Sequence, residues 1–303
     1  MAKILICDKV APELLEGVKA LGHNVLYQTG MSEEELIKIV PEYNAMVVRS
    51  ATKVTEKVID AGLSSLKVII RAGVGIDNIK HQYAREKGIA VRNTPAASSP
   101  SVAELAIGHM FSVYRYIARS TWRMRTGDQF KLIKKESQGR ELAGKTLGII
   151  GIGRIGKEVA KRANALGMNI IAYDAFVDNP GLDYVKMVTL DNLLTDADIV
   201  SLHIPKGEKP VIGKTELDKM KDGAVLINTA RGGVVDEDAL LDALNSGKLW
   251  GAAVDVWIGE PQPKPELVNH PLVSATPHLG ASTTEAQLRI GEEVVKILKE
   301  VFG

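Results

Sequence analysis

The stretch Ile149–Ala163, IIGIGRIGKEVAKRA, decides how this chain folds. It carries Gly151, Gly153 and Gly156 in the spacing G-x-G-x-x-G, directly after an apolar run and at the start of a helical pattern. The first glycine permits a tight turn, the second lets backbone amides approach a pyrophosphate, and the third lets the helix pack close to the strand. The stretch therefore predicts a strand, a glycine loop and a helix that together bind a dinucleotide.

A carboxylate stands where such a loop needs one. Asp174 follows Gly156 by eighteen residues and ends the next predicted strand, 170–173. There it can accept hydrogen bonds from an adenosine ribose, and it would repel a 2′-phosphate. No arginine or lysine follows at 175–178. We expect NAD rather than NADP; the alternative is a plain tight turn followed by a surface aspartate.

Two series of strands and helices flank a long helical pattern. Apolar runs at 146–150, 170–173, 199–203, 225–228, 252–256 and 272–275 predict six strands with helices between them. Earlier runs at 3–8, 24–28, 45–49, 66–70 and 89–92 alternate with helices such as 32–40, where Ser32 and Glu35 fit a capping box. Buried runs that alternate with helices indicate parallel sheets. Residues 98–125 read as one long helix that joins two domains or packs against a second subunit.

Composition narrows the class of protein. The 303 residues are 45% hydrophobic and 25% charged, with a formal net charge of +1, which does not favour a nucleic-acid-binding protein. Cys7 is the one cysteine, and no Cys and His residues show zinc spacing, so we expect neither a disulfide nor a metal site. No apolar run is long enough to cross a membrane, and the chain enters a strand without a signal-peptide pattern. We expect a cytoplasmic protein.

Three residues of catalytic type follow predicted strands. Arg231 (TARGG) can bind a carboxylate with both arms of its guanidinium, and Glu260 (GEPQP) and His278 (TPHLG) can pair as carboxylate and imidazole. The carboxyl ends of parallel strands meet at one edge of a sheet, where ligands bind. A lone histidine is more often structural, so the case for His278 depends on the other two residues.

The ordered motifs GIGRIG, TARGGVVDE, DVWIGEP and PHLGAST resemble the D-isomer-specific 2-hydroxyacid dehydrogenase family over essentially the whole chain. The resemblance implies an NAD-dependent oxidoreductase. His278 would exchange a proton with the substrate oxygen, Glu260 would orient His278, and Arg231 would bind the α-carboxylate. It also implies that the last helix returns to the first domain. The expected fold is thus α/β with two doubly wound parallel-sheet domains: a flavodoxin-like substrate domain, 1–96 and 277–303, and a Rossmann-like NAD domain, 97–276.

The family's cofactor contacts can be carried over residue by residue. Besides the three glycines and Asp174, they fall on Arg154, Ile155, His203, Thr229, Ala230, Asp255 and Gly280. The chain ends at Gly303, before the regulatory domains of longer members, so we expect none.

Two arginines of the first domain suggest a substrate. Arg49 and Arg71 each end a predicted strand beside small residues, Ser50 and Gly73, and a pair of arginines suits a phosphate. Arg49 lies in the motif VVRSATKVT and Arg71 in the motif IIRAGVGIDNI, which also contains Val74 and Asn78; we expect both of these to help bind the substrate. Within the family these motifs are most similar to those of D-3-phosphoglycerate dehydrogenases, the entry step of serine synthesis. The predicted partners are therefore a phosphorylated 2-hydroxy acid and a second copy of the chain in a homodimer.

Three alternatives stay open at this point. The arginines could be solvated loop charges. The enzyme could be a broader 2-hydroxyacid dehydrogenase, such as a hydroxypyruvate or glyoxylate reductase. The same fold also serves as a nucleotide-sensing corepressor.

Overall fold

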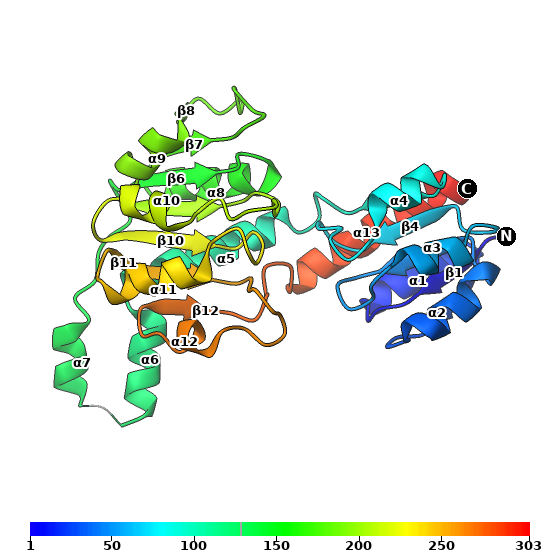
Figure 1. Ribbon diagram of the computed structural model, residues 1–303, viewed down its shortest axis with the longest axis horizontal. Helices are drawn as coiled ribbons and strands as arrows, with labels where there is room; N and C mark the ends of the chain where they lie inside the picture. Colours follow the sequence, from blue (N-terminus) through cyan, green and yellow to red (C-terminus); the bar gives the residue numbers. More distant parts are fainter. Residues whose placement is uncertain (128) are drawn as a thin grey trace. The chain divides into compact units, whose positions relative to one another are not determined.

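The computed structural model describes residues 1–127 and 129–303 and divides them into two compact units (Figure 1). Unit 1 comprises Met1–Ser98 and Ala281–Gly303, and unit 2 comprises Ser99–Gly280. The sequence had placed the two crossings between units after residues 96 and 276, which is two and four residues earlier.

Unit 1 is built on a five-stranded parallel sheet in the order β2-β1-β3-β4-β5, the flavodoxin-like order. Its elements are β1 (Lys3–Ile6), α1 (Pro12–Ala20), β2 (Asn24–Tyr27), α2 (Glu33–Ile39), the 3₁₀ turn η1 (Val40–Glu42), β3 (Ala45–Val48), α3 (Glu56–Ala61), β4 (Val68–Arg71), α4 (His81–Glu86), β5 (Ala90–Asn93) and α13 (Thr284–Phe302). The capping box predicted before α2 is present, since Ser32 and Glu35 each accept a hydrogen bond from the other's backbone amide.

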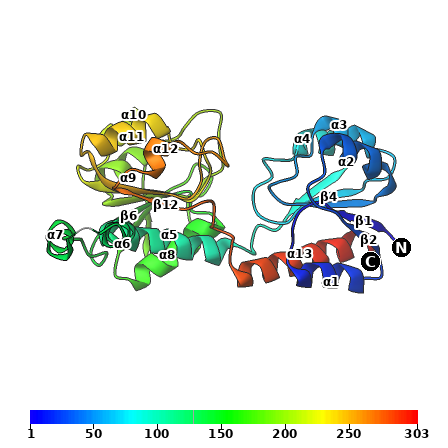
Figure 2. The same cartoon turned by 90° about the horizontal axis from the view of Figure 1, so that it is seen from below.

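The last helix belongs to unit 1 because of its apolar face. Ile290 and Val294 of α13 are buried in one cluster with Leu14 and Val18 of α1. Figure 2 shows α13 and α1 side by side beneath the sheet, while α2, α3 and α4 cover its other face. A helix with such a face would expose it to water if it did not return to this sheet.

Unit 2 is built on a seven-stranded parallel sheet in the order β12-β11-β10-β9-β6-β7-β8, which contains the Rossmann order. Its elements are α5 (Ser99–Tyr114), α6 (Ile117–Arg125), α7 (Phe130–Glu136), β6 (Thr146–Ile150), α8 (Arg154–Ala165), β7 (Asn169–Tyr173), β8 (Val185–Met187), α9 (Leu190–Asp196), β9 (Ile199–Leu202), α10 (Lys214–Lys219), β10 (Ala224–Asn228), α11 (Glu237–Asn245), β11 (Leu249–Val254), α12 (Pro265–Val268) and β12 (Val273–Ala275). The α/β fold with two parallel sheets is confirmed. The prediction of six strands missed β8, which is three residues long and has Lys186 at its centre.

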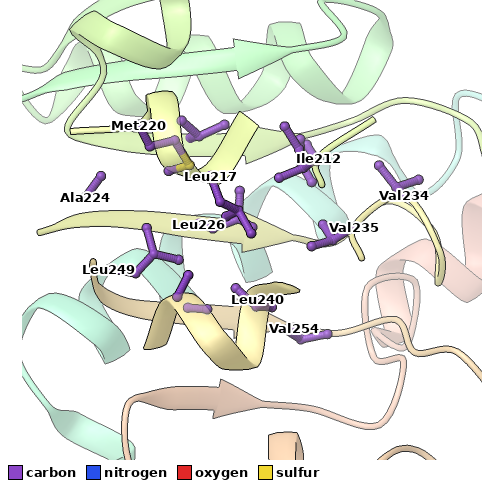
Figure 3. Packing of buried hydrophobic residues seen from close by; sticks show 14 of the residues in the cluster. Ile212, Leu217, Met220, Ala224, Leu226, Val234, Val235, Leu240, Leu249 and Val254 are labelled. Carbon is purple, nitrogen blue, oxygen red and sulfur yellow. The ribbon is translucent and has the colours of Figure 1, made fainter. Parts of the chain in front are cut away.

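Alternating side chains of the strands fill two cores, one on each face of this sheet. In β10, Leu226 packs with α10 and α11, as Figure 3 shows, while Val225 and Ile227 face α5 and α8. This alternation follows from the two-residue period of a strand, and strands apolar on both faces are typical of a parallel sheet covered by helices. The covered faces leave the strand ends as the place for polar chemistry.

The prediction of one long helix over residues 98–125 is wrong. α5 ends at Tyr114, and Tyr116 takes a left-handed conformation with φ of 53° before α6 begins. Tyr114 is fully buried, whereas no residue of α6 is buried. The helix therefore breaks where it leaves the cover of the sheet, and the Tyr116 ring packs against Trp250 at 5.5 Å between centroids.

Three further features concern the single cysteine, membrane-spanning helices and metal sites. Cys7 is buried and unpaired in the described residues, and burial raises the pKa of its thiol. Within residues 1–127 and 129–303, no helix combines the length and the apolar character needed to cross a membrane. The same residues hold no group of three or more His, Cys, Asp or Glu side chains suited to a metal ion.

Candidate active site in unit 2

The three glycines of the loop after β6 meet three different steric demands. Gly151 has φ of 93°, and a Cβ there would lie 2.6 Å from the His203 carbonyl oxygen. A Cβ at Gly156 would overlap with the Gly151 carbonyl oxygen, so only glycine lets α8 approach the strand. A Cβ at Gly153 would meet nothing within 4 Å. The space beside Gly153 is thus open, as a site for a pyrophosphate requires.

The surroundings of this loop fit a dinucleotide. No side chain caps the N-terminus of α8, where Arg154 and Ile155 are the first helical residues, so its leading amides can bind an anion. Thr229 Oγ1 and His203 Nδ1 are buried, with no hydrogen-bond partner among the described residues. Buried polar atoms are nearly always paired, so both fit a ligand at this edge of the sheet.

Asp174 lies at the end of β7, next to the glycine loop. Its Oδ2 accepts a hydrogen bond from the Ile152 amide at 2.9 Å, and its Oδ1 accepts one from Phe176 at 2.9 Å. A carboxylate offers about four acceptor positions, so two remain for ribose hydroxyls. Asp174 therefore holds the loop, and its expected contact with the ribose remains a prediction.

His203 follows β9, the strand beside β6, at the point where the strand order reverses. Its Nε2 lies 2.9 Å from Ser201 Oγ, and burial lowers the pKa of the imidazole to about 3. The ring is therefore neutral at physiological pH and contributes hydrogen bonding without charge.

His278 and Glu260 meet as a pair beyond β12 and β11. His278 Nδ1 lies 2.9 Å from Glu260 Oε2, and the other carboxylate oxygen accepts a hydrogen bond from the Trp257 amide at 2.8 Å. Both side chains remain partly exposed, His278 at 46% and Glu260 at 36%. Since Nδ1 faces the carboxylate, Nε2 is the nitrogen left to exchange a proton with a substrate.

Arg231 lies just beyond β10, the strand next to β11. Its Nη1 donates to the Ala230 carbonyl at 2.7 Å, which holds the side chain close to its own backbone. Asn228 shapes this turn, because its Oδ1 accepts from the Ala230 amide and its Nδ2 donates to the Arg231 carbonyl. The sequence analysis missed Asn228, although an asparagine placed two residues before a bonded amide is the signature of an Asx turn.

Asp255 has a position that the sequence did not reveal. It is 1% exposed and accepts hydrogen bonds from the amides of Leu279, at 2.7 Å, and Gly280, at 2.9 Å. The Thr276 hydroxyl donates to it at 2.6 Å. Asp255 therefore uses most of its acceptor positions to hold residues 276–280, which we call the His278 loop. The role of cofactor contact expected for Asp255 and Gly280 remains a prediction.

An apolar pocket adjoins the imidazole–carboxylate pair. It has a volume of ≈ 280 Å³ and is lined by Trp257, Glu260, Pro261, Pro263, Val268, Ala275, Thr276, Pro277 and His278.

The expected substrate residues lie in unit 1. Arg49 follows β3, and its Nη1 donates to the Lys9 carbonyl at 2.9 Å. Asp8, which follows β1, accepts hydrogen bonds from the Arg49 amide and from the amide and hydroxyl of Thr52. Asn78 donates to the carbonyls of Arg49 and Thr52, both at 2.6 Å. Asn78 thus holds the Arg49 loop, where Ser50 is exposed, at the β1/β3 point where the strand order reverses.

Arg71 ends β4, the neighbour of β3. Its guanidinium lies over Gly73, whose φ of 147° is one that residues with a side chain rarely adopt. The Gly73 amide donates to the Arg71 carbonyl at 2.9 Å, and Asn93 donates to the Val74 carbonyl at 2.5 Å. Arg49 and Arg71 therefore lie at the carboxyl ends of adjacent strands.

Comparisons with known proteins identify the family to which the chain belongs. A family model described as the NAD binding domain of D-isomer specific 2-hydroxyacid dehydrogenases matches residues 107–280. The chain is 49% identical to a hydroxypyruvate reductase of Thermotoga maritima, over 97% of this chain and 95% of that protein. It is 44% identical to a D-3-phosphoglycerate dehydrogenase of Archaeoglobus fulgidus over 98% of this chain, but spans only 57% of that relative's length. A D-lactate dehydrogenase of Aquifex aeolicus, solved with NAD and lactic acid, aligns with a TM-score of 0.83 and 32% identity over 99% of this chain and 95% of that one.

Proposed function

The chain belongs to the D-isomer-specific 2-hydroxyacid dehydrogenase family, and on that premise we propose that it interconverts D-3-phosphoglycerate and 3-phosphohydroxypyruvate with NAD. The observation that carries the reaction type is the His278–Glu260 pair, at 2.9 Å, on the sheet edge that also carries the glycine loop. Unit 1 would supply the substrate-binding residues Arg49, Ser50, Arg71, Gly73, Val74 and Asn78.

In this reaction His278, Glu260 and Arg231 of unit 2 each have a defined role. NAD, held by the glycine loop and Asp174, would supply the acceptor for the hydride that leaves C2 of the hydroxy acid. His278 Nε2 takes the proton of the C2 hydroxyl, and Glu260 stabilises the imidazolium that results. Arg231 binds the carboxylate and keeps C2 in place. In the reverse direction the same imidazolium returns its proton to the keto oxygen.

The arginines of unit 1 favour a phosphorylated substrate. A phosphate needs cationic donors at the far end of the molecule from C2, and Arg49 and Arg71 lie on adjacent strand ends. Asp8, which accepts hydrogen bonds from the loop, and Asn78, which donates to it, hold the Arg49 loop before substrate arrives, which lowers the entropy cost of binding.

A second candidate is hydroxypyruvate reduction. It is favoured by the Thermotoga maritima relative, named a hydroxypyruvate reductase, which this chain matches over 95% of its length. Hydroxypyruvate and 3-phosphohydroxypyruvate differ only by the phosphate. The two candidate functions therefore differ only in whether the protein binds the phosphate group.

The experiment compares NADH oxidation with these two keto acids in three proteins: the wild type, Arg49→Ala and Arg71→Ala. A charged contact contributes about 1.5–3 kcal/mol, so each substitution should lower kcat/KM for 3-phosphohydroxypyruvate by roughly tenfold to a hundredfold. Turnover of hydroxypyruvate should be poor in the wild type and nearly unchanged in the variants. Arg85→Ala, an exposed arginine of α4, is the matched control for charge.

If the wild type uses both keto acids equally, or if the variants lose both activities to the same extent, then the arginines do not read phosphate. The hydroxypyruvate reductase assignment would replace the phosphoglycerate one.

A further inference from the structure

A buried histidine outside the reacting groups is connected to the His278 loop. His109 lies on α5 and is 3% exposed, and its two ring nitrogens lie 3.0 Å from the hydroxyls of Ser274 and Thr276. The Thr276 hydroxyl donates in turn to Asp255, which accepts from the amides of Leu279 and Gly280. A continuous set of hydrogen bonds therefore runs from the middle of α5 to the two amides that follow His278.

The hydrogen bonds of this network determine which ring nitrogen of His109 carries the proton. Thr276 has a single hydroxyl hydrogen, and the Asp255 carboxylate takes it. The Thr276 oxygen must then accept, so His109 Nε2 carries the proton and donates. Burial lowers the pKa of His109, against the opposing effect of Asp255, so the ring is neutral and Nδ1 is the unprotonated nitrogen, 3.0 Å from Ser274 Oγ.

The loop needs such support because His278 has an uncommon backbone. Its φ is 56°, in the left-handed region that favours glycine and asparagine. In that conformation His278 Nδ1 reaches Glu260. The hydrogen bonds to Asp255 fix the next two peptide units, so they also fix the direction in which the imidazole points.

We propose that His109 is a positioning residue for His278, acting through Thr276 and Asp255 to hold the His278 loop in its left-handed form. The inference rests on the proposed function of His278 as proton carrier. Without His109, the Thr276 hydroxyl loses the donor that orients it, and the buried Ser274 hydroxyl loses its contact with the ring. The loop then samples conformations in which His278 turns away from Glu260.

The first experiment measures hydrogen exchange at residues 276–280 without any need for activity. His109→Leu should speed exchange of the Leu279 and Gly280 amides by roughly twofold to tenfold, the effect of one lost hydrogen bond, while exchange in β6 stays as in the wild type. His109→Gln places an amide nitrogen near the position of Nε2 and should restore slow exchange. Ser112→Ala removes only the hydroxyl 2.9 Å beyond Ser274 and should leave the loop's exchange as in the wild type.

The second experiment measures steady-state kinetics. His109→Leu should lower kcat by a similar twofold to tenfold with KM for NAD unchanged, and His109→Gln should recover it. Thr276→Val, which has nearly the same shape, should reproduce the loss, and the double variant should add little because both residues act through one path. The inference is overturned if His109→Leu leaves loop exchange unchanged, or if the losses in the double variant are additive. A wild type with no dehydrogenase activity would instead count against the proposed function, and hydrogen exchange would still decide the role of His109.

Discussion

In the proposed reaction, the residue on which turnover should depend most is His278, through its Nε2. His278→Asn keeps a residue that tolerates the left-handed backbone and removes the proton carrier. We expect kcat to fall by roughly 10²–10⁴-fold, the usual range for a positioned acid–base group. NADH binding, followed by the fluorescence of the bound cofactor, should stay close to that of the wild type. A variant that turns over at a near-normal rate would show that another group moves the proton.

His203 makes the stability of the fold sensitive to acid. Its pKa is lowered to about 3 in the folded protein, against about 6.5 in the unfolded chain. Between those pH values the unfolded chain binds more protons than the folded protein does. The contribution of His203 to the free energy of unfolding is therefore fully present above pH 6.5 and is lost as the pH drops towards 3. The buried His109, whose pKa is also lowered, adds to the same trend.

His203→Gln should therefore make the urea midpoint less dependent on pH between 7.5 and 5 without abolishing the slope. The measurement is a set of urea unfolding curves at fixed ionic strength. Parallel pH profiles for the variant and the wild type would mean that His203 is protonated as easily in the folded protein as in the unfolded one.

At the scale of the element, two glycines beside α8 should have different roles, one in binding NAD and the other in the packing of the helix. Gly153→Ala adds a Cβ to open space, whereas Gly156→Ala forces one into the Gly151 carbonyl. Gly153→Ala should leave the Tm within a few degrees of the wild type but weaken NAD binding, because the methyl group takes room that the pyrophosphate needs. Gly156→Ala should lower both, with a loss of stability of about 1–3 kcal/mol from overpacking.

Thermal unfolding and calorimetric titration with NAD distinguish the two variants. Equal affinity for NAD in Gly153→Ala and the wild type would contradict the placement of the pyrophosphate beside this loop.

At the scale of the whole molecule, the helices α6 and α7 bear on assembly. Figures 1 and 2 show them side by side at one end of unit 2. Their exposed apolar side chains are Ile117, Trp122, Met124, Phe130 and Leu132. A cluster of large apolar side chains on a surface is typical of a protein–protein interface, and a two-fold dimer is the commonest way to cover one.

We therefore expect light scattering to give twice the 32.7 kDa of one chain at micromolar concentration. Trp122→Glu or Phe130→Glu should shift the protein towards the monomer. Phe176→Glu, which changes an aromatic residue that is 96% exposed elsewhere in unit 2, is the control. A wild type that is monomeric under these conditions would remove the argument for a dimer.

The sequence by itself determined the features that depend on local spacing. Gly151, Gly153, Gly156 and Asp174 stand in a fixed spacing around one strand and one helix, so a short pattern was enough to predict a dinucleotide loop and NAD as the cofactor. The two parallel sheets followed from apolar runs that alternate with helices, because each such run must be buried on both faces.

Only the tertiary structure decided the features that depend on contacts between distant residues. His109 and Thr276 are 167 residues apart in the chain, and no local pattern links them. The break at Tyr116 arises where α5 leaves the cover of the sheet, although the apolar spacing in the sequence extends past it to Ile117. In the same way Asp255 looked like a cofactor contact from its motif, and its hydrogen bonds to the His278 loop became visible only once β11 and β12 lay side by side. Local periodicity records which residues share a face of one element, whereas packing between elements decides which polar groups on those faces meet.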